Sequence, residues 1–242
     1  MNRVPFPFRD FVRVKQGLWA ALTEQDDVYA LLVGDTGTGK TALLRELRGD
    51  LDRARFRVLY FSQARKLGAA GLVKVIGEAL RVRLSMCHSL TLDRLQRALA
   101  EESQRVLVWL DEAHDLSEET LCQARALAES DLDGERRVHV LLAGLPRLRA
   151  ELALHAHLWR RIVVREEITG LGFDELEGFL EHHFEAQAKR LDEGGLRALF
   201  ERGKGAPGLL LPMYKSVLAR ASTKGKIETG SVEEALERWD LP

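Results

Sequence analysis

The residues with the clearest chemistry form a glycine-rich segment with the sequence GDTGTGKT. It matches the pattern G-x-x-x-x-G-K-[ST], in which backbone N–H groups surround the phosphates of a nucleotide. In that pattern we expect Lys40 to reach the β- and γ-phosphates and the Thr41 hydroxyl to bind magnesium. The sequence therefore predicts an ATP-binding loop made of Gly34, Asp35, Thr36, Gly37, Thr38, Gly39, Lys40 and Thr41.

A second set of candidate catalytic residues follows the apolar run VLVWL, in the sequence DEAH. Asp111 and Glu112 come directly after that run, so they are expected at the carboxyl edge of a sheet, where ligands of open α/β folds bind. We expect Asp111 to hold Mg²⁺ and Glu112 to polarise the attacking water. The extra strand expected at 57–61, between the two motifs, is typical of P-loop ATPases with a catalytic glutamate and argues against a kinase or a small GTPase.

Short apolar runs alternate with helical patterns through the first two thirds of the chain. The alternation predicts a parallel five-stranded sheet covered by helices on both faces, with right-handed crossovers. Strands are expected at 29–33, 57–61, 106–110, 138–143 and 162–167, and helices at about 69–81, 90–103 and 117–130, with a short one after Pro146.

From Asp174 onward the strand signals stop and apolar residues recur at helical spacing. Asp174 with Glu177, and Ser231 with Glu234, are expected to start two of the helices. We place a hinge at Gly170–Gly172, which divides the chain into a P-loop ATPase α/β subdomain (1–170) and a helical lid subdomain (171–242).

Composition excludes several classes of protein. The 242 residues are 45% hydrophobic and 30% charged, as in a globular chain, and 36 basic residues nearly cancel 37 acidic ones. The apolar runs are far shorter than the roughly 20 residues of a membrane span. The N-terminal residues show no signal sequence, and Cys87 and Cys122 are too few for a disulfide framework. A cytoplasmic protein without a membrane segment is expected.

Six blocks together resemble the AAA+ ATPases of the ExeA, TnsC and TniB type, to which MuB is related. They are GDTGTGKT, RVLYF, VLVWLDEAH, VHVLLAGLPRL, LWRRIVVREEI and GKGAPGLLLPMYKSVLARA. The resemblance runs from Phe6 to Leu236. It implies ATP and Mg²⁺ as cofactors, self-assembly with ATP into a ring or filament, and binding to double-stranded DNA with little sequence selectivity. The transposition-regulator branch, which recruits or activates a transposase or target-selection protein, is favoured. The alternative is an ExeA-like switch ATPase that assists assembly of a secretion or other complex without DNA.

The resemblance also assigns residues beyond the two ATPase motifs. Arg161, and less directly Arg160, fall where the family carries an arginine that acts on the neighbouring subunit's nucleotide. The alternative is a surface pair facing Glu166 or Glu167. Two positions depart from the family pattern. Leu145 stands where the family tends to have a polar residue, and Gly208 stands where secretion-type relatives carry a lid arginine, although TniB-like lids also resemble this chain without it. Slow basal hydrolysis is therefore expected.

The remaining candidates are weaker. Arg65 and Lys66 lie in the loop that relatives direct toward the axis of their assemblies, and are expected to contact DNA phosphates, although a solvated loop fits equally well. His114 either couples the γ-phosphate site to a partner or caps a helix. The other histidines considered, His155, His157, His182 and His183, lack the sequence spacing of a metal site and are expected to be surface or half-buried residues.

Overall fold

The structure, a computed structural model, describes residues 4–24, 29–62, 64, 67–128, 138–221 and 225–239. They belong to two compact units. The sheet unit comprises Lys15–Gly34 and Leu44–Glu167; the lid unit comprises Met1–Val14, Asp35–Leu43 and Ile168–Pro242.

A parallel five-stranded sheet is the centre of the sheet unit, in the order β2-β3-β4-β1-β5. This confirms the predicted fold class. The strands are β1 (Tyr29–Val33), β2 (Phe56–Phe61), β3 (Arg105–Leu110), β4 (Val138–Gly144) and β5 (Val164–Glu167). β1 and β4 are buried along their whole length, and β3 from its second residue on, as the unbroken apolar run 106–110 predicts for a strand covered on both faces. The last strand starts later than expected, because Arg161–Ile162 complete a turn that follows α7.

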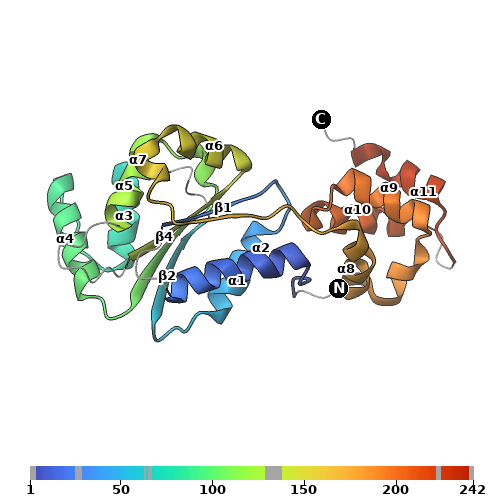
Figure 1. The fold of residues 1–242 in the computed structure, drawn as a ribbon, viewed down its shortest axis with the longest axis horizontal. Coiled ribbons are helices and arrows are strands. Elements are labelled where there is room, and N and C mark those ends of the chain that lie inside the picture. The colour runs from blue at the N-terminus through green and yellow to red at the C-terminus, as the bar shows by residue number, and fades with distance from the viewer. Residues whose placement is uncertain are drawn as a thin grey trace. The chain divides into compact units, whose positions relative to one another are not determined.

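Helices complete the sheet unit (Figure 1). They are α1 (Arg9–Glu24) and α2 (Lys40–Asp50), each of which begins in the lid unit, then α3 (Ala69–Ala79), α4 (His88–Glu101), η2 (Ala113–Asp115), α5 (Glu118–Ala128), α6 (Pro146–Leu154) and α7 (Ala156–Trp159). Alternate residues of β1, β3 and β4, such as Leu31, Val108 and Val140, share one core with buried residues of α3 to α7. On α1, Lys15 pairs with Glu46 and Asp50 of α2.

The described residues of the lid unit after Ile168 form helices, as the loss of strand signals predicts. These are α8 (Phe173–Phe184), η3 (Glu185–Arg190), α9 (Glu193–Gly203), α10 (Pro207–Arg220), α11 (Thr229–Leu236) and η4 (Glu237–Trp239). Leu191 and Ile227 also form an isolated parallel bridge. Phe6 packs edge-on against Phe179 of α8, with ring centroids 5.8 Å apart, so the N-terminal segment is part of this unit.

Two predicted helix starts are wrong. α8 begins at Phe173, because the Glu175 carboxylate accepts the backbone N–H of Gly172 at 2.9 Å and that of Arg9 at 2.7 Å. Asp174 instead pairs with the Arg9 guanidinium. α11 begins at Thr229 rather than near Ser231, since the Ser231 N–H already bonds to the Glu228 carbonyl at 3.0 Å.

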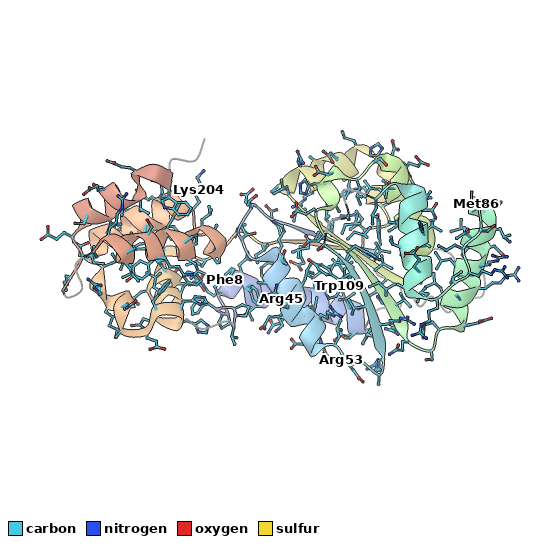
Figure 2. The ribbon with its side chains drawn as sticks, turned by 180° about the vertical axis from the view of Figure 1, so that it is seen from behind. Phe8, Arg45, Arg53, Met86, Trp109 and Lys204 are labelled. Atoms are coloured by element: carbon cyan, nitrogen blue, oxygen red, sulfur yellow. The ribbon has the colours of Figure 1, made fainter. Side chains whose placement is uncertain are left out.

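Two labelled side chains of the sheet unit illustrate the extremes of burial (Figure 2). Trp109 of β3 is among the largest fully buried side chains, whereas Met86, in the segment before α4, is fully exposed. Within the described ranges, no helix combines the length and the apolar character that a bilayer span requires.

Candidate functional site

The glycine-rich loop leaves the end of a fully buried strand. β1 ends at Val33, and the Gly34 N–H donates to the Gly144 carbonyl at 3.2 Å, which continues the β1–β4 pairing by one residue. Gly37 and Gly39 have φ angles of +83° and +105°, a region that side chains disfavour. These two positions therefore require glycine for the loop to turn into α2, which begins at Lys40.

One carbonyl organises the interior of the loop. The Asp35 carbonyl oxygen accepts the Thr38 N–H at 3.3 Å, the Thr38 hydroxyl at 2.9 Å and the Lys40 ammonium at 2.9 Å. Lys40 is 8% exposed, so its charge is held against the loop backbone. Thr41 is exposed in the first turn of α2. A helix N-terminus with a buried lysine beside it fits the phosphate groups of a nucleotide.

The lid unit contains a direct contact with this loop. The Gly208 N–H, at the second residue of α10, donates to the Gly37 carbonyl at 2.8 Å. A Cβ atom added at Gly208 would lie 2.9 Å from the Gly37 Cα, closer than Cβ atoms are found in proteins. The absence of a side chain at position 208 thus allows the α10 backbone to lie against the loop backbone.

The carboxylate of Asp111 is buried and held by two donors. Its Oδ2 accepts the Tyr60 hydroxyl at 2.8 Å, and its Oδ1 accepts the Glu112 N–H at 3.0 Å. The side chain belongs to a residue only 3% exposed, directly after β3. A buried, oriented carboxylate suits a position in the coordination sphere of a hard cation such as Mg²⁺.

Glu112 adopts an unusual backbone conformation beside a buried histidine. Its φ of 58° and ψ of 34° place it in the left-handed region. Its carboxylate Oε2 lies 3.5 Å from the His114 Nε2, and its side chain is 47% exposed. A non-glycine residue in this region stores strain, which is found at functional sites.

His114 connects Glu112 with the end of β4. Its Nδ1 accepts the Leu145 N–H at 3.3 Å, which leaves the proton of a neutral ring on Nε2, facing Glu112. A Cβ atom at Gly144 would lie 3.1 Å from the same Nδ1, so glycine allows the imidazole this close. His114 thus supplies a polar ring at the end of the strand where Leu145 offers only its backbone.

Chain topology brings the starts of the two motifs to one edge of the sheet. β1 and β3 are parallel and separated by β4 alone, so Gly34 and Asp111 both leave the carboxyl edge of the sheet. This is the edge at which ligands of open α/β sheets bind.

The structure describes the two arginines before β5 but not the two residues that were expected to contact DNA. Arg160 and Arg161 are both exposed in the turn between α7 and β5. Glu167 pairs with Arg149 at 2.9 Å. Arg65 and Lys66 lie outside the described residues. The roles of all four remain predictions.

Sequence reasoning missed three contributions to this site. Tyr60 gave no signal of its own, because β2 is read as a plain strand. His114 accepts a hydrogen bond from Leu145, 31 positions away, and Gly37 accepts one from Gly208, 171 positions away. Contacts across such separations give no local signal in the sequence. Only the Asp-Glu-Ala-His string pointed to His114 in advance.

Comparison with known proteins identifies the family to which the two motifs belong. A family profile described as an AAA domain matches residues 24–152. No curated protein matches the chain. Among solved structures, Cdc6p from Pyrobaculum aerophilum is similar, with 19% identity and a TM-score of 0.67 over 90% of this chain and 62% of that protein. The Aeropyrum pernix ORC2 protein, solved as ADPNP–ADP complexes, is similar with 17% identity and a TM-score of 0.66 over 97% of this chain and 69% of that protein. The Aeropyrum pernix ORC1 protein, solved in complex with DNA, is similar with 19% identity and a TM-score of 0.63 over 98% of this chain and 66% of that protein.

These structures share the fold of the chain, which spans 62 to 69% of their lengths. The profile covers more than half of the 242 residues, including the whole of Gly34–Thr41 and Asp111–Glu112. The chain belongs to the AAA domain family.

Proposed function

We propose that the protein is an ATPase that hydrolyses ATP to ADP and phosphate with Mg²⁺. The observation that carries this proposal is that β1, which leads into the lysine-bearing glycine loop, and β3, which leads into the Asp-Glu pair, end at the same carboxyl edge of one parallel sheet. The residues present fit the cofactors, since Gly37 and Gly39 allow the loop to curve and Asp111 offers a buried carboxylate.

Each residue then has a defined task. Backbone N–H groups of the loop and the first turn of α2 bind the phosphate oxygens. Lys40 exchanges the Asp35 carbonyl for the β- and γ-phosphates. Thr41 and Asp111 would hold the Mg²⁺, whose charge would offset that of the phosphates. Glu112 orients the attacking water and accepts its proton, while His114 fixes the direction of the Glu112 carboxylate.

The proposal extends to assembly and DNA. Arg161, with Arg160 as the second candidate, is exposed after α7 and would reach the nucleotide of a neighbouring copy. The Aeropyrum ORC1 protein, which shares the fold, was solved with DNA. We infer that this chain assembles with ATP on double-stranded DNA, with Arg65 and Lys66 on phosphates, and regulates transposition by recruiting or activating a transposase.

Gel retardation separates the parts of this proposal. The parent protein is mixed with double-stranded DNA and Mg²⁺, either with ATP, with ADP or without nucleotide. The control is Lys40→Ala, a variant that is expected not to bind ATP. We expect retardation with ATP alone, which Lys40→Ala abolishes. The logarithm of the DNA-binding constant falls linearly with the logarithm of the salt concentration. If Arg65 and Lys66 each contact a phosphate, the double variant Arg65→Ala/Lys66→Ala should flatten that slope by about two units.

Other outcomes of this experiment are equally informative. ATP hydrolysis without retardation would keep the ATPase and refute the DNA role, in favour of a switch that assembles a protein complex. An unchanged salt slope would move the DNA contacts away from Arg65 and Lys66.

A further inference from the structure

Two pairs of side chains from distant segments, Glu118 and Cys122 with His155 and His157, meet on the surface of the sheet unit. Glu118 and Cys122 are four positions apart on α5, so they lie on one face of the helix. His157 lies on α7, and His155 immediately precedes that helix. One ligand atom from each of Glu118, Cys122 and His157 lies within 4.8 Å of the others. The expectation that His157 is a surface or half-buried residue is confirmed, because it is exposed. Its neighbours Glu118 and Cys122 come from another helix, so no spacing in the sequence indicates this cluster.

The chemistry of this cluster matches zinc. Thiolate sulfur, imidazole nitrogen and carboxylate oxygen are the three ligand types that Zn²⁺ takes in proteins. A tetrahedral ion with bonds of about 2.3 Å to sulfur and about 2.05 Å to nitrogen separates those two atoms by about 3.6 Å. The measured distance from Cys122 Sγ to His157 Nε2 is 3.5 Å. This pair is thus already at the separation that a shared ion requires.

Neighbouring groups hold the ligands in place. His155 Nδ1 lies 3.0 Å from Glu118 Oε1, and its ring meets that of His157 edge-on with centroids 5.9 Å apart. The Arg125 guanidinium donates to the His157 carbonyl at 3.4 Å, which restrains the backbone of α7. Hydrogen bonds from surrounding groups to ligating carboxylates and restraint of ligating histidines are the usual supports of metal sites.

We propose that Glu118, Cys122 and His157 bind a Zn²⁺ ion, with His155 as the residue that positions Glu118. Cys122 is half-buried and the other two ligands are exposed, so the ion has access from solvent and an open fourth position for water. The ion would join α5 to α7, the helix directly before Arg160 and Arg161. The inference does not depend on ATP hydrolysis.

Cobalt substitution tests the site directly. The full chain, free of any affinity tag and kept reduced, is titrated with Co²⁺ in the absence of nucleotide, and Zn²⁺ is then added. We expect the near-ultraviolet thiolate-to-cobalt band for one ion per chain, which Zn²⁺ displaces. Cys122→Ser should abolish the band, and His157→Ala should abolish it or weaken Co²⁺ and Zn²⁺ binding strongly.

Cys87 provides a matched control. Cys87 is exposed and forms no disulfide, and the hydrogen bond with the Ser89 hydroxyl is the main cause that lowers the pKa of its thiol. Non-specific binding of a metal by a thiolate would therefore be expected at Cys87 before Cys122. Cys87→Ser should keep the parental band. His155→Ala should keep the band and weaken Zn²⁺ binding by about 10- to 100-fold, as expected for a residue that positions a ligand.

The proposal would be overturned by an absence of stoichiometric binding by the reduced parent, by a thiolate band that Cys122→Ser retains, or by a band lost in Cys87→Ser instead. His157 is exposed, so His157→Ala is expected to fold, which circular dichroism verifies. Unchanged binding by that folded variant would equally refute the site.

Discussion

The contact between Gly208 and Gly37 makes a sharp prediction about stability. An alanine Cβ at position 208 would lie 2.9 Å from the Gly37 Cα, 3.1 Å from its carbonyl oxygen and 3.4 Å from its carbonyl carbon. The atoms it meets are backbone and not the flexible end of a side chain, so α10 or the loop must move and stretch the 2.8 Å hydrogen bond. Overpacking of this kind costs about 1–3 kcal/mol. Replacing glycine returns about 0.4–1 kcal/mol by restricting the unfolded chain. Taking the middle of each range, we expect Gly208→Ala to lower the free energy of unfolding by about 1.3 kcal/mol.

Gly230→Ala is the matched control for this substitution. Gly230 is the second residue of α11, as Gly208 is of α10, and an added Cβ would meet nothing within 4 Å. This variant should be neutral or gain up to about 1 kcal/mol. The assay is urea unfolding followed by far-ultraviolet circular dichroism at constant protein concentration. Equal midpoints and slopes for the two variants would show that α10 does not pack against the loop, and would refute the reasoning.

Three further substitutions test the site and the fold. Glu112→Gln should bind ATP as tightly as the parent but release phosphate about 10²- to 10⁴-fold more slowly, because the amide cannot accept a proton; parental turnover would reassign the base. His114→Ala should lower kcat about tenfold, or about 1.4 kcal/mol in barrier, with little change in nucleotide affinity, because the carboxylate of Glu112 loses its neighbour; a loss of affinity without a change in kcat would contradict this. Burial raises the pKa of Tyr214 to about 12, so its neutral form is favoured by folding, and its hydroxyl donates to the Gln187 carbonyl at 2.5 Å. The stability that the parent holds over Tyr214→Phe should be complete below about pH 10 and decline between pH 10 and about 12; denaturant titrations across that range would disagree if the difference grew with pH.

Local sequence signals were sufficient for the parallel sheet. β1, β3 and β4 are mostly apolar because helices cover both faces, so a run such as VLVWL identifies its own strand, although β4 also buries His139. The glycine loop could be predicted because its two positive φ angles are requirements of single residues. The AAA domain family follows from the same two motifs, since its profile spans both.

Contacts between distant segments could not be predicted in the same way. The start of α8 is set by Glu175 bonding to Arg9, which lies 166 residues earlier, so a local capping pattern chose the wrong residue. The contact between Gly208 and Gly37 joins two backbones and needs no characteristic side chain. Likewise, Cys122 and His157 become neighbours only when α5 packs beside α7, and no spacing in the chain encodes their 3.5 Å separation.

The most direct test of the central proposal is the stabilisation of the protein by Mg·ATP, measured by thermal unfolding of the parent and Lys40→Ala side by side. Lys40 contacts the loop carbonyl of Asp35 rather than an apolar core, so the variant should keep the fold. At a hundredfold excess of ligand over its Kd, the parent should gain about 2.7 kcal/mol and the variant almost nothing. An equal gain in both proteins, or none in the parent at any Mg·ATP concentration, would contradict nucleotide binding by this loop.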